Sequence, residues 1–160
     1  MKKILNLILL LIFILFSACS VHNQSCISPA MKSIIIKWGD LNSKTGEIKG
    51  WQMDAKLNIQ KLNQNSFKDS LILEKMAETN EENFCYFVKL IQDSLRSVQT
   101  LSVFTETSRF VEINNKDKNF QWRGVWNKEF DTYLSKGFRW IYDSLNAKLI
   151  VPNLKKEKKQ

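Results

Sequence analysis

Histidine, glycine and proline are scarce in this chain of 160 residues, which has one, five and two of them. The single histidine, His22, lies in a polar stretch near the N-terminus, where nothing holds it against a nucleophile or a metal ion. Serine–histidine and cysteine–histidine catalysis and histidine-based zinc sites therefore lack their usual residues. The glycines are too scattered for a phosphate-binding loop or a dinucleotide pattern; they are Gly39, Gly46, Gly50, Gly124 and Gly137. The sequence thus predicts neither a metal site nor a bound cofactor.

Pairs of carboxylates are the remaining source of acid–base chemistry. Glu112 with Asp117, and Glu129 with Asp131, are the pairs that resemble the acid and base of a glycosidase. Nothing in their spacing distinguishes them from charged surface. We therefore predict no catalytic residues and a protein that is not an enzyme, with a carboxylate-dependent hydrolase as an alternative.

The N-terminal residues have the composition of an export signal. Lys2 and Lys3 are followed by an almost uninterrupted apolar run over residues 4–16 and by the small residues Ser17 and Ala18. This order is typical of a secretory signal peptide. The apolar run has about a dozen residues, whereas a membrane-spanning helix needs about 20. We therefore expect residues 1–18 to be removed.

The sequence Phe16-Ser17-Ala18-Cys19 resembles the lipobox of bacterial lipoproteins. The resemblance covers residues 1–19, and Phe16 stands where the family usually has Leu or another aliphatic residue. It implies lipidation of the Cys19 thiol, acylation of the new N-terminus and a cell-envelope protein bound to the membrane by its lipid anchor. Ser20, which is not Asp, implies sorting to the outer membrane where the cell has one. An ordinary secretory signal with an unmodified Cys19 is the alternative.

The remaining chain has the length of one domain, since about 140 residues is a common domain size. We predict a lipidated tether at residues 19–29, a single domain at residues 30–151 and a basic tail at residues 152–160. Cys26 and Cys85 lie in a compartment where disulfides persist. Two cysteines only permit a pairing, so a disulfide and two free thiols both remain open.

The positive charge is concentrated at the C-terminus. The formal net charge of +8 falls to +6 without Lys2 and Lys3, and residues 154–160 carry +3 of it. A nucleic-acid interface needs a basic stripe on a structured face. We therefore predict no nucleic-acid partner. The tail instead favours solubility or a weak attraction to anionic headgroups, with about 1 kcal/mol for each basic residue near such a surface.

Alternating apolar and polar residues predict strands. We expect one strand over residues 31–38 and another over residues 51–60, paired antiparallel across the loop at residues 41–49. Residues 67–76 fit either a short third strand or an extension of the following helix, and we predict the strand. Residues 100–114 and 120–126 predict two more strands, joined as a hairpin by a polar turn.

Two segments have the spacing of amphipathic helices. Thr79 and Glu82 have capping-box spacing and predict a helix with a stripe of Phe84, Phe87, Val88, Ile91, Leu95 and Val98, and with Arg96 in its last turn. A second helix is expected from Ser135 to Pro152, with a stripe of Phe138, Ile141, Tyr142, Leu145 and Leu149. The predicted fold class is α+β, with an antiparallel sheet of about four to five strands and two amphipathic helices packed on one face.

Trp140 and Tyr86 point away from these helical stripes. Exposed Trp and Tyr are favoured anchors of protein interfaces, so we expect these residues to form a surface for another envelope protein; coverage by the tail or a loop is the alternative. The expected function is a non-catalytic binding or accessory module of the envelope. A tethered inhibitor or immunity-type protein against an exported enzyme is the second expectation.

Overall fold

The structure is a computed structural model, and it describes residues 25–95, 101–129 and 132–150. The signal sequence, Cys19, His22 and the basic tail lie outside these residues. The strands are β1 (Ile34–Asn42), β2 (Ile48–Asp54), β3 (Asn58–Gln64), β4 (Ile72–Glu78), β5 (Leu101–Ser102), β6 (Thr107–Asn115) and β7 (Phe120–Asn127). The helices are α2 (Glu81–Leu95) and α3 (Lys136–Leu145). Four short helical turns accompany them: Pro29–Met31, Lys116–Lys118, Tyr133–Ser135 and Asn146–Ile150.

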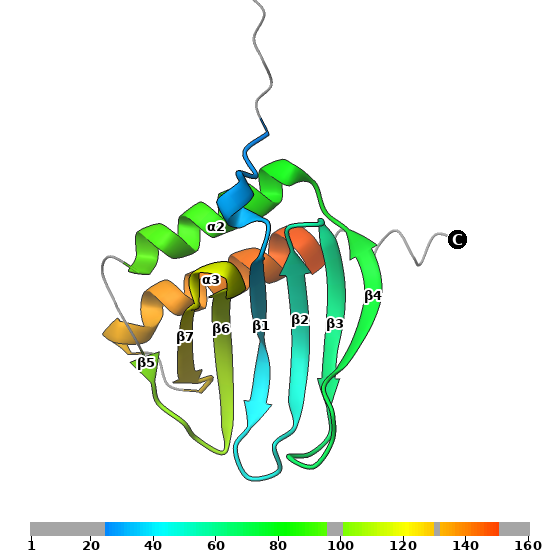
Figure 1. Ribbon diagram of the computed structural model, residues 1–160. Coiled ribbons are helices and arrows are strands. Elements are labelled where there is room, and N and C mark those ends of the chain that lie inside the picture. Colours follow the sequence, from blue (N-terminus) through cyan, green and yellow to red (C-terminus); the bar gives the residue numbers. More distant parts are fainter. Residues whose placement is uncertain (1–24, 96–100, 130–131, 151–160) are drawn as a thin grey trace, which may run out of the picture.

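The described strands form one sheet in the order β4-β3-β2-β1-β6-β7-β5 (Figure 1). Neighbouring strands are antiparallel except β5 and β7, which pair in parallel. The prediction of an α+β fold is confirmed. The sheet has seven strands and is mixed, so the predicted antiparallel sheet of about four to five strands is too small.

The predicted strand over residues 51–60 is wrong, because a turn divides it into β2 and β3. Asp54 Oδ1 accepts hydrogen bonds from the backbone N–H groups of Lys56 (2.9 Å) and Asn58 (3.1 Å). Leu57 has a positive φ of 68° and donates its N–H to Asp54 O (2.9 Å). The alternation continues through this turn because Ala55 and Leu57 still pack against the core. The predicted antiparallel pairing of the first two strands is confirmed.

The expected strand over residues 100–114 is also two strands. β5 lies at the far edge of the sheet beside β7, whereas β6 lies between β1 and β7. A turn separates them, in which Thr105 N–H donates to Ser108 Oγ (2.9 Å). Of the predicted strand at residues 67–76, only the part from Ile72 onward is in β4. The hairpin of β6 and β7 is confirmed.

The helices begin close to their predicted positions, but the N-terminal cap of α2 differs. Asn80 Oδ1 accepts the Asn83 N–H (2.8 Å), which makes Asn80 the capping residue. Thr79 donates its N–H to Leu57 O (2.8 Å) and is therefore tied to the sheet. The predicted cap at Thr79 is wrong. Helix α3 follows Ser135 as predicted, whereas Arg96, Val98 and Pro152 lie outside the described residues.

Both helices bury their apolar stripes in one core. Phe84, Phe87 and Ile91 of α2 and Phe138, Ile141 and Leu145 of α3 pack there with one face of the sheet, which contributes Ile36, Trp38, Met53, Ile59, Ile113, Trp122 and Trp126. Each such side chain stabilises the fold by about 1.5–3 kcal/mol relative to an exposed one. Trp38 Nε1 donates to Asn146 Oδ1 (3.1 Å), which fixes the end of α3 over β1. Among the described residues, no helix has both the length and the hydropathy that crossing a membrane requires.

Candidate functional site

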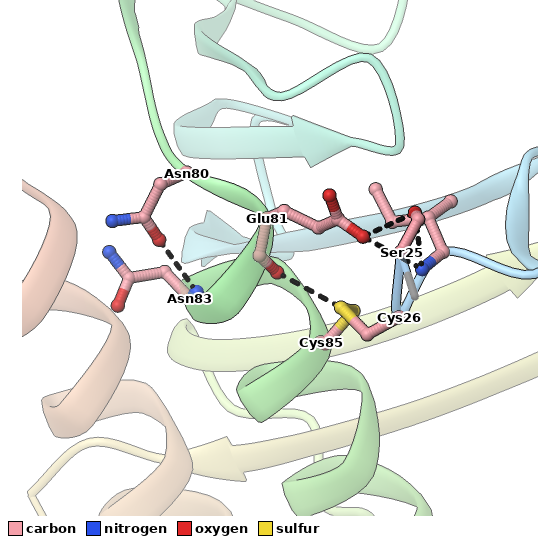
Figure 2. Close-up of a disulfide and its surroundings, with 7 residues drawn as sticks. Ser25, Cys26, Asn80, Glu81, Asn83 and Cys85 are labelled. Atoms are coloured by element: carbon pink, nitrogen blue, oxygen red, sulfur yellow. Dashed lines mark hydrogen bonds between the residues drawn. A yellow bond between two sulfur atoms is a disulfide. The ribbon is translucent and has the colours of Figure 1, made fainter. Parts of the chain in front are cut away.

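A disulfide between Cys26 and Cys85 joins the segment before β1 to α2 (Figure 2). The pairing that the sequence left open is therefore present. Glu81, in the first turn of α2, accepts two further bonds from the same segment: the Ser25 hydroxyl and the Ile27 N–H (3.2 Å) both donate to its Oε1. We call Ser25, Cys26, Ile27, Glu81 and Cys85 the clamp. The clamp attaches the predicted tether to the domain from residue 25 onward.

The carboxylate of Glu81 is suited to accept the hydrogen bonds of the clamp. The hydrogen bond from the Ser25 hydroxyl, followed by that from the Ile27 N–H, lowers the pKa of Glu81 below its usual value. Its position in the first turn of a helix also favours negative charge. The ligand atoms of Cys26, Glu81 and Cys85 lie within 4.8 Å of one another. The two sulfur atoms are bonded to each other, however, so they are not thiolate ligands for a metal in this form.

A hollow of about 310 Å³ lies on the helix-bearing face of the sheet, beside α3. The helices cross the strands near the end from which the N-terminal segment leaves, and the strands extend beyond them at the other end (Figure 1). The hollow is lined by Gly39, Asp40, Lys49, Gly50, Trp51, Lys61, Asn63 and Tyr142. The strand register assembles these residues, because Asp40, Lys49 and Asn63 form one row across β1, β2 and β3, and Trp51 lies opposite Lys61 in the next row.

Asp40, Arg109 and Tyr142 form a network at one wall of the hollow. Asp40 Oδ1 lies 3.5 Å from Arg109 Nε and 3.5 Å from the Tyr142 hydroxyl, which donates to it. The Arg109 guanidinium also lies over the Tyr142 ring, 4.7 Å from its centroid. Burial, together with the negative charge of Asp40, raises the pKa of Tyr142 above its usual value of 10.0. Tyr142 therefore stays protonated and remains a donor at neutral pH.

The other wall carries polar groups that the fold does not satisfy. Asn63 Oδ1 is buried and has no hydrogen-bond partner in the described part of the chain. Lys49 pairs with Glu47. Lys61 is exposed, and no carboxylate of the described residues forms an ion pair with it. The hollow therefore offers one cation, the Lys61 ammonium, to a ligand, whereas Asn63 Oδ1 is closed off from it.

The two aromatic residues predicted as a partner surface lie on the outer sides of the helices. Trp140 is 54% exposed and Tyr86 is 42% exposed. The Lys148 ammonium lies 4.3 Å from the centroid of the Tyr86 ring, and the edge of Tyr86 packs on Phe87 with the centroids 5.1 Å apart. Tyr86 therefore helps to join α2 to the helical turn Asn146–Ile150 that follows α3, whereas Trp140 presents its indole to solvent.

The described carboxylates among those considered for catalysis lie in different surroundings. Glu112 lies between Lys37 and Arg123, with an N–O distance of 3.7 Å to each. Asp117 is exposed in the turn Lys116–Lys118. Glu129 is also exposed, and Asp131 lies outside the described residues. Glu112 of β6 thus forms ion pairs with Lys37 of β1 and Arg123 of β7.

The sequence did not identify the hollow, although a signal was present. Asp40 and Lys49 have the same strand parity as the core residue Trp38 and as Trp51, which packs against the core, so they are charged residues on the face that packs inward. Charged side chains on such a face indicate that the core ends there. Their union with Lys61 and Asn63 depends on register, which the sequence does not contain. The chain matches no known protein-family model and no curated protein sequence.

Proposed function

We propose that this protein is a lipid-anchored, non-catalytic binding module of the bacterial cell envelope. The observation that carries the proposal is the clamp, because a disulfide persists in oxidising compartments outside the cytoplasm. The lipobox-like sequence at residues 16–19 supports the same location. The clamp and the lipobox act together, since the disulfide fixes the domain to a chain that begins at the lipidated cysteine.

The clamp limits how far the domain extends from its anchor. The six peptide steps from Cys19 to Ser25 span at most about 22 Å. The domain is therefore held close to the membrane with the start of β1 and α2 directed toward it. The hollow near the far end of β1 then faces away from the membrane, toward soluble or polymeric components of the envelope.

The anchor is tested by the mass of the mature protein. Wild-type protein purified from membranes should begin at Cys19 and carry a diacylglycerol and an acyl chain. Cys19→Ser should yield an uncleaved or soluble form. An intact mass without lipid on wild-type protein would contradict the anchor, although it would leave the folded domain unaffected.

The partner surface is tested at Trp140. Trp140→Ala removes an exposed side chain, so the free energy of unfolding should change by no more than about 0.5 kcal/mol. Loss of an interface hot spot costs 2 kcal/mol or more, which is over about twentyfold in affinity. Crosslinking in native membranes should therefore lose an envelope partner while the melting temperature stays unchanged. Lys136→Ala, on the same outer side of α3, is the matched control.

Two outcomes would oppose this role for Trp140. Unfolding of Trp140→Ala would show that the indole belongs to the core. Equal crosslinking of Trp140→Ala and wild-type protein would remove the residue from the interface.

The inhibitor function is the second candidate, and the loop between β3 and β4 favours it. Phe67 in this loop is 67% exposed, and the edge strand β4 exposes Ile72 and Leu73. Apolar residues on a loop and an unpaired strand edge are features that enter clefts or extend sheets of other proteins. In that case Phe67→Ser should abolish binding of an exported enzyme and Trp140→Ala should not. The hydrolase function has less support, because the lining carboxylate of the hollow, Asp40, is paired with Arg109.

A further inference from the structure

Three consecutive exposed apolar residues lie at the start of the edge strand β4. Leu71, Ile72 and Leu73 are 38%, 58% and 44% exposed. In the described part of the chain, β4 has a neighbouring strand on one side only, which is β3. Its other side therefore presents backbone N–H and C=O groups that can pair with a further strand. The register with β3 shifts after Lys75, so the regular part of this edge is residues 72–75.

A second copy of this chain fits the edge in one register. Two identical strands that pair antiparallel are related by a two-fold axis perpendicular to the sheet, so one residue at the centre lies opposite itself. With Ile72 at this centre, Leu71 lies opposite Leu73 of the second copy. Two positions further out, Asp69 lies opposite Lys75 of the second copy. Apolar side chains thus meet apolar side chains, and an ion pair flanks them on each side.

The registers centred further along β4 match less well. Centring the pair on Leu73 places Lys75 opposite Leu71. Centring it on Glu74 or Lys75 places two like charges opposite each other, which is destabilising. The register centred on Ile72 is therefore favoured by both the apolar and the charged residues.

The side chains that meet in this register are accessible. Asp69 and Lys75 are both exposed. Lys75 has an ion pair with Glu78 (2.7 Å), in which both side chains are more than half exposed, and such a surface pair contributes little to stability. Leu73 lies opposite Leu62 of β3, which is buried in the apolar cluster that is separate from the main core. A second copy would extend this apolar row across the interface.

We propose that two copies of this protein pair antiparallel through the edges of β4, with Ile72 on the two-fold axis. The pairing extends each strand backward over residues 69–71. Ile72 lies in the same cross-strand row as Asp40, near the end of β1 that is remote from the anchor. Because the paired strands run in opposite directions, the two anchors leave opposite ends of the dimer, and the pairing joins copies held on facing membranes. This consequence rests on the proposed lipid anchor, whereas the dimer itself does not.

Cysteine crosslinking of the mature protein in detergent tests the symmetry. Ile72→Cys places two thiols opposite each other, with the Cβ atoms about 4.5–5.5 Å apart, so mild oxidation should link the dimer through a disulfide. Glu74→Cys, on the same face of the same strand, is the matched control. Its two thiols would lie about 14 Å apart along the strands, so it should give no linked dimer. Wild-type protein measures any crosslinking through Cys19.

Sedimentation equilibrium in detergent tests the charges. Asp69→Lys and Lys75→Asp should each weaken the dimer about tenfold or more, because each variant places two pairs of like charges at the interface. The double variant Asp69→Lys/Lys75→Asp exchanges the charges and should recover the wild-type affinity to within about threefold. Lys89→Asp, at an exposed position on α2, is the control and should leave the affinity unchanged. These positions are exposed, and melting curves identify any variant that fails to fold.

Three results would overturn the dimer. The first is a wild-type monomer up to about 0.5 mM, where a dimer with a Kd of about 0.1 mM would be mostly assembled; the edge would then be left to another protein, such as an exported enzyme. The second is equal crosslinking of Ile72→Cys and Glu74→Cys. The third is a double variant that stays as weak as the single ones.

Vesicles that carry the mature lipoprotein test the facing-membrane arrangement. Wild-type protein and the double variant should cluster the vesicles, and the two single charge variants should not. A dimer in detergent without vesicle clustering would overturn this arrangement and the proposed orientation of the domain, while the pairing itself would stand. A mature protein without lipid would contradict the anchor alone.

Discussion

Gly39 and Gly50 face each other across β1 and β2 so closely that a Cβ on Gly39 would lie 2.6 Å from the Gly50 Cα. The same atom would lie 2.4 Å from the backbone oxygen of Lys49. Leu62 and Phe110 flank the pair in the same cross-strand row, and both are buried in a second apolar cluster with Leu41 and Val125, on the face opposite the helices. The two glycines therefore let β1 and β2 approach beneath this cluster, and they also border the hollow on the other face.

Gly39→Ala should destabilise the domain, because the added methyl group meets backbone atoms that cannot move away. Overpacking of this kind typically costs about 1–3 kcal/mol. Gly137→Ala is the matched control, since no atom lies within 4 Å of its added Cβ. Within a helix that change stabilises by up to about 1 kcal/mol. Urea denaturation of both variants measures the difference, and equal midpoints would contradict the close approach.

Phe87→Ala should lower the free energy of unfolding by about 3–5 kcal/mol. Phe87 is completely buried in the core between α2 and the sheet, so its removal loses burial and leaves a cavity. Lys89→Ala, on the exposed side of the same helix, should stay within about 0.5 kcal/mol of wild type. An unchanged melting curve for Phe87→Ala would mean that this face of α2 does not contact the sheet.

Loss of the disulfide should destabilise the domain by an amount set by the loop that it closes. Cys26 and Cys85 are 59 residues apart, and the chain-entropy relation gives about 4 kcal/mol for a loop of that size. Guanidinium unfolding with and without reductant measures the loss. The Cys26→Ser/Cys85→Ser double variant should match the reduced wild type and show no further effect of reductant. Identical unfolding of oxidised and reduced wild type would show that the clamp adds no stability.

Ionisation of Tyr142 should lower the free energy of unfolding at alkaline pH. Its pKa is raised in the folded protein, chiefly by burial, so the unfolded chain loses its proton first. The folded state then binds more protons than the unfolded state, and the free energy of unfolding falls as pH rises through the unfolded value of 10.0 toward the folded one. Below that range Tyr142 is protonated in both states and makes no pH-dependent contribution.

Absorbance titration of the phenolates and alkaline denaturation curves measure this effect. One of the three tyrosines should ionise later than in a free peptide, and Tyr142→Phe should remove that late step and flatten the alkaline loss of stability. Tyr86→Phe, at a more exposed position, is the control. A late step that persists in Tyr142→Phe would assign the raised pKa to another residue.

Features carried by neighbouring residues were predictable from sequence, whereas strand boundaries were less so. The start of α3 after Ser135, the buried stripe around Phe87 and the exposure of Trp140 follow from the helical repeat alone. The turn that begins at Asp54 was not predicted. Ala55 and Leu57 lie in this turn but still pack against the core, so the alternation of apolar and polar residues continues where the chain reverses. The cap moved from Thr79 to Asn80 because the Thr79 N–H pairs with Leu57 O of the hairpin turn.

The helices, the α+β class and the residues that the core requires can be inferred from the sequence, because helical hydrogen bonds and the apolar stripe connect positions only three or four residues apart. The parallel edge strand β5, the Cys26–Cys85 disulfide and the hollow become visible only in the folded chain. Each of these depends on contacts between distant segments. Asp40, Lys49 and Asn63 became neighbours through strand register, and register is set by which strands pair and where their turns fall.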